Sequence, residues 1–196
     1  DIEQVCVDLQ RHIEGATPTF SNKHRTIRPS GQWAWMMTHG KVVQWDDLGR
    51  PLRLVGTHTD ITERVLASLI FAHCEQAIFI ADENQCIQST NPAFHELTGL
   101  EPAEVVGKDF PELVSASSQS RSAGSLMNTL PNNGQWEGER WIPRKDGGEF
   151  CAFVSVKISP HLERGSGHYI GLMTDITAQK EADQAIRRNQ KLDAVG

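Results

Sequence analysis

The octapeptide Gly171-Leu172-Met173-Thr174-Asp175-Ile176-Thr177-Ala178 has an earlier counterpart in the chain, Gly56-Thr57-His58-Thr59-Asp60-Ile61-Thr62-Glu63. The two stretches share a glycine, two threonines, an aspartate and an isoleucine in the same register. Such internal similarity is the signature of a repeated structural unit. We therefore expect two copies of one fold, and the Asp-Ile-Thr sequences at Asp60 and Asp175 fix where each copy ends.

Each copy of the motif follows a segment with the pattern of a three-stranded meander. Strand-like runs at residues 20–28, 33–45 and 52–59 lead to the first motif, and runs at 136–144, 149–159 and 168–174 lead to the second. The first turn contains Ser30-Gly31 in one copy and Asp146-Gly147 in the other. Glycine readily adopts the positive φ of a tight hairpin, so we predict three successive antiparallel strands in both copies.

The second copy has a longer segment in front of its meander. Short apolar strands are expected at residues 77–82 and 86–90, followed by short helices at 93–97 and 101–106 that end close to glycines. A serine-rich stretch at 115–125 favours a loop that leads into a helix at 126–130, with a flexible linker as its alternative.

The first copy begins instead with one amphipathic helix over residues 1–14, whose apolar face carries Ile2, Val5, Leu9 and Ile13. The absence of a front segment from this copy points to truncation rather than to a different fold. Because the sequence starts at Asp1 without a methionine and stops in a helical segment, we expect it to be a fragment of a longer protein.

The composition indicates a globular protein and disfavours several functions. Hydrophobic residues make up 38% and charged residues 22% of the chain, and the formal net charge of −6 provides no basic patch for nucleic acid or an anionic membrane. No apolar run reaches the roughly 18–20 residues that span a bilayer. The four scattered cysteines form no CxxC pair, which favours a cytoplasmic protein without disulfides or thiolate metal sites.

Motifs typical of enzymes and metal sites are missing from the sequence. It contains no GxxxxGKS/T loop, no HExxH and no GxSxG, so we expect no catalytic activity in this segment. His24, His39 and His58 lie on predicted strands, but their separations do not match common metal-ligand spacings. We therefore predict no metal site.

Six short motifs, in their order and spacing, resemble the PAS family with its C-terminal PAC segment. They are Asn91-Pro92-Ala93-Phe94, Leu97-Thr98-Gly99-Leu100, Glu104-Val105-Val106-Gly107-Lys108, Gly134-Gln135-Trp136-Glu137-Gly138-Glu139, Arg144-Lys145-Asp146-Gly147 and Thr174-Asp175-Ile176-Thr177. The resemblance implies an α+β fold: a PAS-like five-stranded antiparallel sheet with flanking helices, preceded by a three-stranded half-PAS and followed by a C-terminal signalling helix. The implied divisions are a C-terminal half of a PAS domain (1–62), a short linker helix (63–71), a complete PAS/PAC domain (72–177) and a coiled-coil-like helix (178–196).

The resemblance also implies a ligand pocket between the sheet and the helices. Its candidate residues are Ile78, Ile80, Phe94, Leu97, Val106, Phe110, Trp136, Trp141 and Phe153. Relatives that form a flavin–cysteine adduct carry a cysteine where residues 107–113 of this chain contain none. Haem-binding relatives use a histidine of the long helix, here about residues 114–130, which also contain none, and we expect His95 to face solvent. We therefore predict no bound cofactor and disfavour haem. A flavin stacked on Trp136 and Trp141, or another small molecule, is the alternative.

The same resemblance implies that Asp175 and Thr177 cap the junction between the last strand and the outgoing helix, and the repeat extends this role to Asp60 and Thr62. Carboxylate and hydroxyl oxygens accept hydrogen bonds from the free N–H groups at a helix start. We assign these four residues to signal relay.

The outgoing helix at residues 178–195 carries a thin heptad seam. Ala178, Ala185 and Leu192 recur every seven residues, with Ala182 and Asn189 between them. This pattern favours a parallel homodimer, although an ordinary solvated helix fits it too. The resemblance places such segments ahead of histidine kinases, which residues 191–196 favour, and of diguanylate cyclases or phosphodiesterases. The sequence thus indicates a regulatory sensor and dimerisation module of a bacterial signalling protein, acting on an output domain of the same chain.

Overall fold

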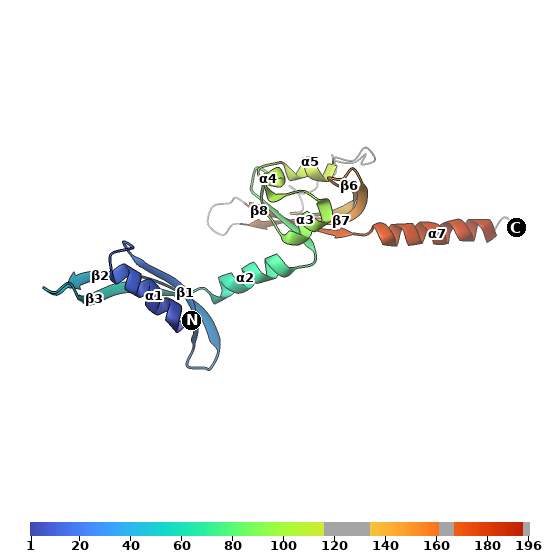
Figure 1. The fold of residues 1–196 in the computed structure, drawn as a ribbon. Helices are drawn as coiled ribbons and strands as arrows, with labels where there is room; N and C mark the ends of the chain where they lie inside the picture. The colour runs from blue at the N-terminus through green and yellow to red at the C-terminus, as the bar shows by residue number, and fades with distance from the viewer. Residues whose placement is uncertain (116–133, 161–166, 194–196) are drawn as a thin grey trace. The chain divides into compact units, whose positions relative to one another are not determined.

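The computed structural model describes residues 1–115, 134–160 and 167–193 of the chain (Figure 1). It divides into two compact units, Asp1–Ile70 and Phe71–Gly196, called unit 1 and unit 2 below. The helix predicted at residues 126–130 and nearly all of the serine-rich stretch lie outside the described residues.

Unit 1 is a three-stranded antiparallel sheet with one helix before it and one after it. Helix α1 (Ile2–Ile13) is followed by β1 (Phe20–Ile27), β2 (Trp33–Trp45) and β3 (Pro51–Asp60), which pair in the order β1-β2-β3. Helix α2 (Thr62–His73) then leads into unit 2. These bounds lie close to those of the predicted amphipathic helix, meander and linker helix.

Helix α1 packs against β1 and is tied to the sheet by side-chain hydrogen bonds. The buried imidazole of His12 accepts from the Val42 N–H at 3.0 Å through Nε2, and its Nδ1 donates to the Thr17 carbonyl oxygen at 2.8 Å. The amide of Asn22 donates to the Asp8 carboxylate. These bonds satisfy polar groups that would be costly to bury without partners.

Unit 2 is a five-stranded antiparallel sheet with the strand order β5-β4-β8-β7-β6. Its strands are β4 (Ala77–Ala81), β5 (Ile87–Thr90), β6 (Gln135–Pro143), β7 (Glu149–Pro160) and β8 (Gly167–Asp175). The described helices of this unit that follow β5 are α3 (Pro92–Thr98), α4 (Pro102–Val105), α5 (Phe110–Ser115) and, after β8, α7 (Thr177–Asp193). The α+β fold predicted from the sequence is confirmed.

Local sequence explains where α3 begins and ends. The Asn91 side chain accepts from the Phe94 N–H at 3.1 Å as an N-cap, and Pro92 occupies the first turn, where its missing N–H is not needed. Gly99 ends the helix in the left-handed conformation, with φ at 73°. The helix delivers Phe94, which is fully buried, to the core.

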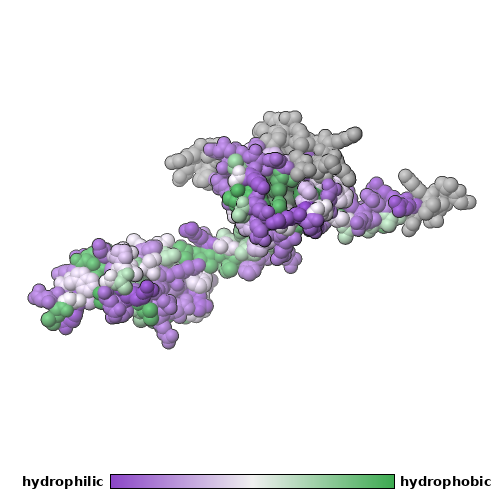
Figure 2. All heavy atoms as spheres, turned by 45° about the horizontal axis from the view of Figure 1, so that its top comes forward, coloured by the Kyte–Doolittle hydropathy of each residue, from purple (hydrophilic) through white to green (hydrophobic). Residues whose placement is uncertain are grey.

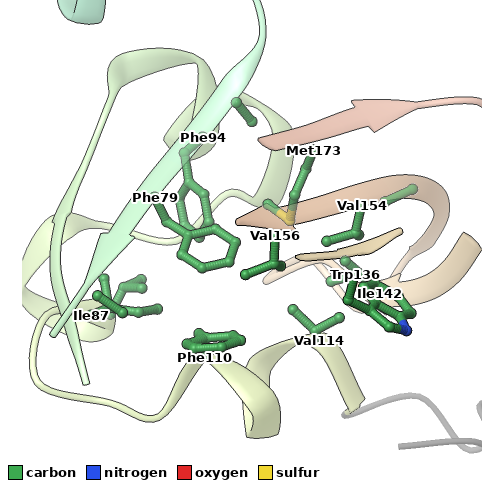
Figure 3. Packing of buried hydrophobic residues seen from close by; sticks show 14 of the residues in the cluster. Phe79, Ile87, Phe94, Phe110, Val114, Trp136, Ile142, Val154, Val156 and Met173 are labelled. Atoms are coloured by element: carbon green, nitrogen blue, oxygen red, sulfur yellow. The ribbon is translucent and has the colours of Figure 1, made fainter. Parts of the chain in front are cut away.

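The core of unit 2 is packed with aromatic and branched side chains from the sheet and the short helices (Figure 3). The ring centres of Phe79 and Phe110 are 5.3 Å apart, and Phe110 lies 5.3 Å from Tyr169. The Phe79 ring fills the space above Gly171 of the neighbouring strand, where a Cβ atom would come within 2.0 Å of the ring. The buried cluster contains Ala77, Phe79, Ala81, Ile87, Phe94, Val105, Phe110, Val114, Trp136, Ile142, Phe150, Ala152, Val154, Val156 and Met173.

The meanders of the two units match row by row. A row here means three residues that pair across the three strands of a meander. Thr59 of the first motif lies in the row Lys23–Met37–Thr59, and Thr174 of the second motif lies in the row Glu139–Phe153–Thr174. Strands β1, β2 and β3 therefore correspond to β6, β7 and β8. The repeated sequence reflects a repeated three-stranded structure.

Candidate signalling junction

The end of β8 is joined to β7 and to α7 through Asp175 and Thr177. The Asp175 carboxylate accepts from the Thr177 N–H at 2.8 Å and from the Thr177 hydroxyl at 2.5 Å. The Thr177 hydroxyl oxygen accepts from the Cys151 N–H at 2.9 Å, and the Ile176 N–H donates to the Cys151 carbonyl oxygen at 2.8 Å. The hydrogen bonds expected of a cap are present here, and they also hold the start of α7 against β7.

Arg144 links this junction to the helices that cover the sheet. Its guanidinium pairs with the Asp175 carboxylate at 2.7 Å and donates to the carbonyl oxygen of Leu97 in α3. It also lies 4.5 Å from the centre of the Phe150 ring, a distance at which an aromatic face attracts a cation. A shift of α3 relative to the sheet therefore acts on the residue that fixes Asp175.

Charge and hydrogen bonding keep Asp175 ionised. Partial burial opposes ionisation, but the hydrogen bonds from Thr177 and the charge of Arg144 outweigh it, so the pKa of Asp175 lies below its ordinary value. Further along α7, Lys180 pairs with Glu139 of β6 at 2.7 Å, and this hydrogen bond raises the pKa of Lys180. The hydrogen bonds of Asp175 with Thr177 and the ion pair of Lys180 with Glu139 bind the first turn of α7 to the sheet.

The same arrangement occurs at the end of β3 in unit 1. The Asp60 carboxylate pairs with Arg28 and accepts from the Thr62 N–H at 2.9 Å, while the Thr62 hydroxyl oxygen accepts from the Trp35 N–H at 2.9 Å. The hydrogen bonds from Thr62 and Arg28 lower the pKa of Asp60 to about 2. The junction is therefore a property of the repeated meander.

The segment that follows α2 also contacts the end of β8. The Gln76 amide donates to the Thr174 hydroxyl at 2.8 Å, and the Asn91 amide donates to the carbonyl oxygens of Cys74 and Gln76 at 3.3 and 2.9 Å. A cleft of about 330 Å³ lies here, and Asp175 is part of its lining. The incoming and outgoing segments of unit 2 are therefore in direct contact.

Four of the predicted pocket residues come together in the interior of unit 2. Phe94, Phe110 and Trp136 belong to the buried cluster (Figure 3), and Leu97 is a partly buried residue that packs against it. They are contributed by α3, α5 and β6, so the structure gathers residues that are distant in sequence. The ligand pocket at this place stays a prediction from the family resemblance.

The other five predicted pocket residues lie outside that cluster, which corrects their expected position. Ile78, Ile80 and Trp141 are half-buried, whereas Val106 and Phe153 are exposed at 48% and 40%. For the four strand residues the reason is alternation: successive side chains point to opposite faces of the sheet, so an error of one position moves a residue out of the interior. Val106 follows the end of α4, and its neighbour Val105 is the buried residue there. The interior positions belong to their neighbours Ala77, Phe79, Ala81, Val105, Ile142, Ala152 and Val154.

Three of the histidines singled out from the sequence, His24, His58 and His95, form hydrogen bonds or ring contacts, whereas His39 is exposed. His95 is half-buried rather than solvent-facing, because its Nδ1 donates to the Leu100 carbonyl oxygen at 2.7 Å and its Nε2 accepts from the Thr90 hydroxyl at 3.0 Å. His24 and His58 lie edge to face, 6.5 Å apart. Within the described ranges, no group of three or more His, Cys, Asp or Glu side chains is arranged to hold a metal ion.

Sequence reasoning did not assign Arg28 and Arg144 to the junction. Each stands just ahead of the glycine turn of its hairpin, in Arg28-Pro29-Ser30-Gly31 and in Arg144-Lys145-Asp146-Gly147. An arginine at the same place in both repeats was the signal that identifies them.

Comparison with known families assigns the chain. Residues 75–178 match the family model of the PAS domain, and residues 1–58 match a second model described as the PAS fold. The chain therefore belongs to the PAS domain family and consists of a half PAS domain followed by a full one. These are sensory domains of signalling proteins.

Curated relatives cover signalling proteins of different kinds. The nitrogen fixation regulatory protein of Klebsiella oxytoca is 30% identical over 130 residues, which are 63% of this chain and 26% of that protein. Two-component system protein A of Emericella nidulans is 30% identical over 111 residues, or 56% of this chain and 16% of that protein. The human high affinity cAMP-specific and IBMX-insensitive 3',5'-cyclic phosphodiesterase 8A is 25% identical over 56% of this chain and 13% of its own length. The chain thus spans about a quarter or less of these relatives.

Solved structures share the fold at low sequence identity. A PAS domain of a protein from Colwellia psychrerythraea matches with a TM-score of 0.53 and 19% identity, over 59% of this chain and 98% of that one. An RNA-binding Light-Oxygen-Voltage receptor matches with a TM-score of 0.57 and 15% identity, over 98% of this chain and 85% of that one. These similarities concern the fold.

Proposed function

We propose that this chain is a regulatory sensor and dimerisation module of a bacterial signal-transduction protein, which relays a signal through α7 to an output domain of the same protein. The observation that carries the proposal is the junction at Asp175. There one carboxylate is bound by Thr177, the first residue of α7, and by Arg144, which also holds the Leu97 carbonyl oxygen of α3. We propose no catalytic residue in this segment.

Arg144 makes the start of α7 sensitive to the interior of unit 2. Phe94 and Leu97 lie on the same short helix, one inside the core and the other packed against it. A change in the interior that moves this helix therefore displaces the carbonyl oxygen that Arg144 binds. Because Asp175 holds the Thr177 N–H, the movement alters the stability of the first turn of α7.

Unit 1 supplies a second input through α2. The residues after this helix are fixed to unit 2 by Asn91, and Gln76 binds Thr174 directly before Asp175. A displacement of α2 along the chain therefore reaches the outgoing junction without passing through the core. The two PAS copies act in series on one helix.

We also propose that α7 pairs in parallel with α7 of a second copy. Its seam residues Ala178, Ala182 and Ala185 are exposed, as is Ile186 beside them, at 55%. Small side chains let two helix backbones approach closely, but they bury little apolar surface, so the pairing is weak and easily switched.

Among the described residues no helix is long and apolar enough to cross a membrane. We place the module in the cytoplasm.

A histidine kinase is the output that we favour. Support comes from the relative named two-component system protein A and from the sequence of residues 191–196. A diguanylate cyclase or phosphodiesterase is the alternative, in keeping with the relative named as a cyclic nucleotide phosphodiesterase.

Light scattering on the full chain and on a variant that ends at Thr177 tests the dimer. We expect a dimer for the full chain and a monomer for the shortened one. Ala185→Glu, on the seam, should dissociate the dimer, whereas Gln184→Glu adds the same charge beside the seam and should not. A monomeric full chain would overturn the dimerisation proposal.

A flavin or small-molecule receptor is the second candidate, favoured by the aromatic residues in the interior of unit 2. Phe94, Phe110 and Trp136 belong to that interior, and aromatic faces of this kind stack on a flavin ring. An absorption spectrum of the purified chain decides the flavin case. Flavin released on denaturation would support it, and a colourless preparation that releases none would exclude it.

A further inference from the structure

Unit 1 contains a groove between its sheet and the first turns of α2. The groove has a volume of about 480 Å³, and its lining includes Lys23 of β1, Met37 of β2, and Arg64 and Val65 of α2. Lys23 stands next to the buried Asn22 on β1, and Met37 next to the buried Thr38 on β2, so Lys23 and Met37 point to the face opposite the one that binds α1. The groove is therefore distinct from the inner face of the sheet, and its volume lies in the range of small-molecule sites.

The groove combines positive charge with apolar surface. Among the described residues, neither Lys23 nor Arg64 forms an ion pair, and the lining contains no aspartate or glutamate. Met37, Ile61 and Val65 provide the apolar part. The Lys23 ammonium lies 4.9 Å from the centre of the Trp35 ring, a contact that leaves its charge without a carboxylate partner. Two cations without carboxylate partners beside an apolar surface are suited to an anion that carries a hydrocarbon body.

Unit 2 shows what a carboxylate does at the matching position. Glu139 takes the place of Lys23 in its row, and it pairs at 2.7 Å with Lys180 of the outgoing helix. The acid thereby fastens that helix to the sheet. In unit 1 the strand position carries Lys23, the helix position that matches Lys180 carries Val65, and Arg64 beside it adds a second cation. Among the described residues, unit 1 therefore has no ion pair of this kind between strand and helix.

We propose that this groove binds a small organic carboxylate with a short apolar body. The carboxylate bridges Lys23 and Arg64 through charge-assisted hydrogen bonds, and the apolar body covers Met37 and Val65. Because Arg64 follows Thr62 by two residues, the bound anion fixes the first turn of α2 to the sheet, as the ion pair of unit 2 fixes α7. Ligand occupancy thus controls the helix that leads into unit 2.

Titration of the full 196-residue chain with 4-methylpentanoate, followed by amide NMR shifts at constant ionic strength, tests the proposal. We expect saturable shifts at Lys23, Thr59 and Arg64. Inorganic phosphate, which carries charge without a hydrocarbon body, should bind more weakly at the same residues. Absence of saturable shifts with 4-methylpentanoate, or tighter binding of phosphate, would overturn the proposal.

Two charge variants of equal size separate specific from general effects. Lys23→Glu places an acid opposite Arg64 as in unit 2, so it should weaken 4-methylpentanoate binding by about tenfold or more while the chain stays folded. Arg11→Glu makes the same charge change on α1, away from the groove, and should leave the affinity unchanged. Equal losses in both variants would contradict the site. Should Lys23→Glu fail to fold, Arg64→Gln must show the same loss for the proposal to stand.

Discussion

The sheets of units 1 and 2 share their register but differ in the chemistry of the faces that carry buried residues. One pair of matched rows consists of Asn22, Thr38 and His58 in unit 1 and of Gly138, Val154 and Met173 in unit 2. Val154 and Met173 of the unit 2 row belong to a large apolar core, whereas the buried hydrophobic residues of unit 1, among those described, are Phe20, Ala34 and Val42. Apolar packing therefore holds unit 2 together, whereas unit 1 relies more on hydrogen bonds and leaves apolar surface along α2 exposed (Figure 2).

The junctions of the two units are nearly identical by contrast. Asp60 and Asp175 each accept from the threonine two residues later and pair with an arginine. The difference is that Arg144 also binds the Leu97 carbonyl oxygen in α3, a helix of the front segment that unit 1 lacks. The meander alone builds the junction, but its coupling to the interior requires helices packed on the sheet.

Removal of the Phe79 ring should have the largest effect and should be confined to unit 2. Phe79 is fully buried against Gly171 and Phe110, and a core Phe→Ala change costs about 3–5 kcal/mol. Phe153→Ala removes the same ring from the opposite face, where it is 40% exposed, and should cost about 1 kcal/mol or less. Amide hydrogen exchange in β7 and β8 measures both, with β1–β3 as the internal reference. Equal costs would contradict the assignment of inner and outer faces.

The sequence of β4, Ala-Ile-Phe-Ile-Ala, does not indicate which face of the strand points into the core. Both alternating sets of this strand are apolar, so hydrophobicity does not say which set points inward. The choice is made by Gly171, which leaves room for Phe79, and that contact depends on the pairing of β4 with β8. The prediction of Trp141 as a pocket residue could have been avoided. Trp141 lies five residues after Trp136 on the same strand, so alternation places the two side chains on opposite faces.

Most of the other strands and helices could be predicted from local sequence signals. The repeated motif, the glycine turns and the Asn91 cap lie within a few residues of the structures that they specify, and they predicted the strands and α3. The helix α5 was missed, although Pro111 in its first turn is a helix-start signal. The contact of Arg144 with Leu97 joins distant segments, so only tertiary packing reveals it.

Arg144→Ala and Arg28→Ala should separate the two junctions. Arg144 and Asp175 are 29% and 34% exposed, and Arg144 also binds a carbonyl oxygen, so its loss should cost about 1–2 kcal/mol. Arg28 and Asp60 are both 42% exposed, so Arg28→Ala should cost about 0.2–1 kcal/mol. Urea denaturation followed by exchange of amides in each unit measures the two costs. Arg144→Lys should not restore stability, because a single ammonium does not span both acceptors. A larger loss for Arg28→Ala would refute the added role of α3.

Thr177→Val should also destabilise its unit more than Thr62→Val does, by a difference similar to that of the two arginine variants. Each change keeps the side-chain shape but removes the hydroxyl oxygen that accepts from the N–H of Cys151 or Trp35. Cys151 is 2% exposed and its N–H would lose its partner away from water, so we expect about 1–2 kcal/mol for Thr177→Val. Trp35 is half-buried, and water can compensate in part, so Thr62→Val should cost less than about 1 kcal/mol. Helicity of α7, read from carbon chemical shifts, should fall in Thr177→Val and persist in Thr177→Ser; unchanged helicity in both would argue against the cap.

The smallest expected effect is that of acid, which should break the hydrogen bonds of Asp60 in the junction of unit 1. The hydrogen bonds of Thr62 and Arg28 favour the ionised form of Asp60 and lower its pKa from 3.8 to about 2. A lowered pKa means that the stabilisation is complete above about pH 4 and is lost as the pH falls through about 2, because protonation then removes the charge that both partners bind. The Thr62 amide shift should therefore titrate with a midpoint near 2 in the full chain and should not follow this step in Asp60→Asn, while Asp47→Asn serves as the matched control. A midpoint near 3.8 would show that Asp60 is not held by Thr62 and Arg28 in solution, and the likeness of the two junctions would then rest on their sequence alone.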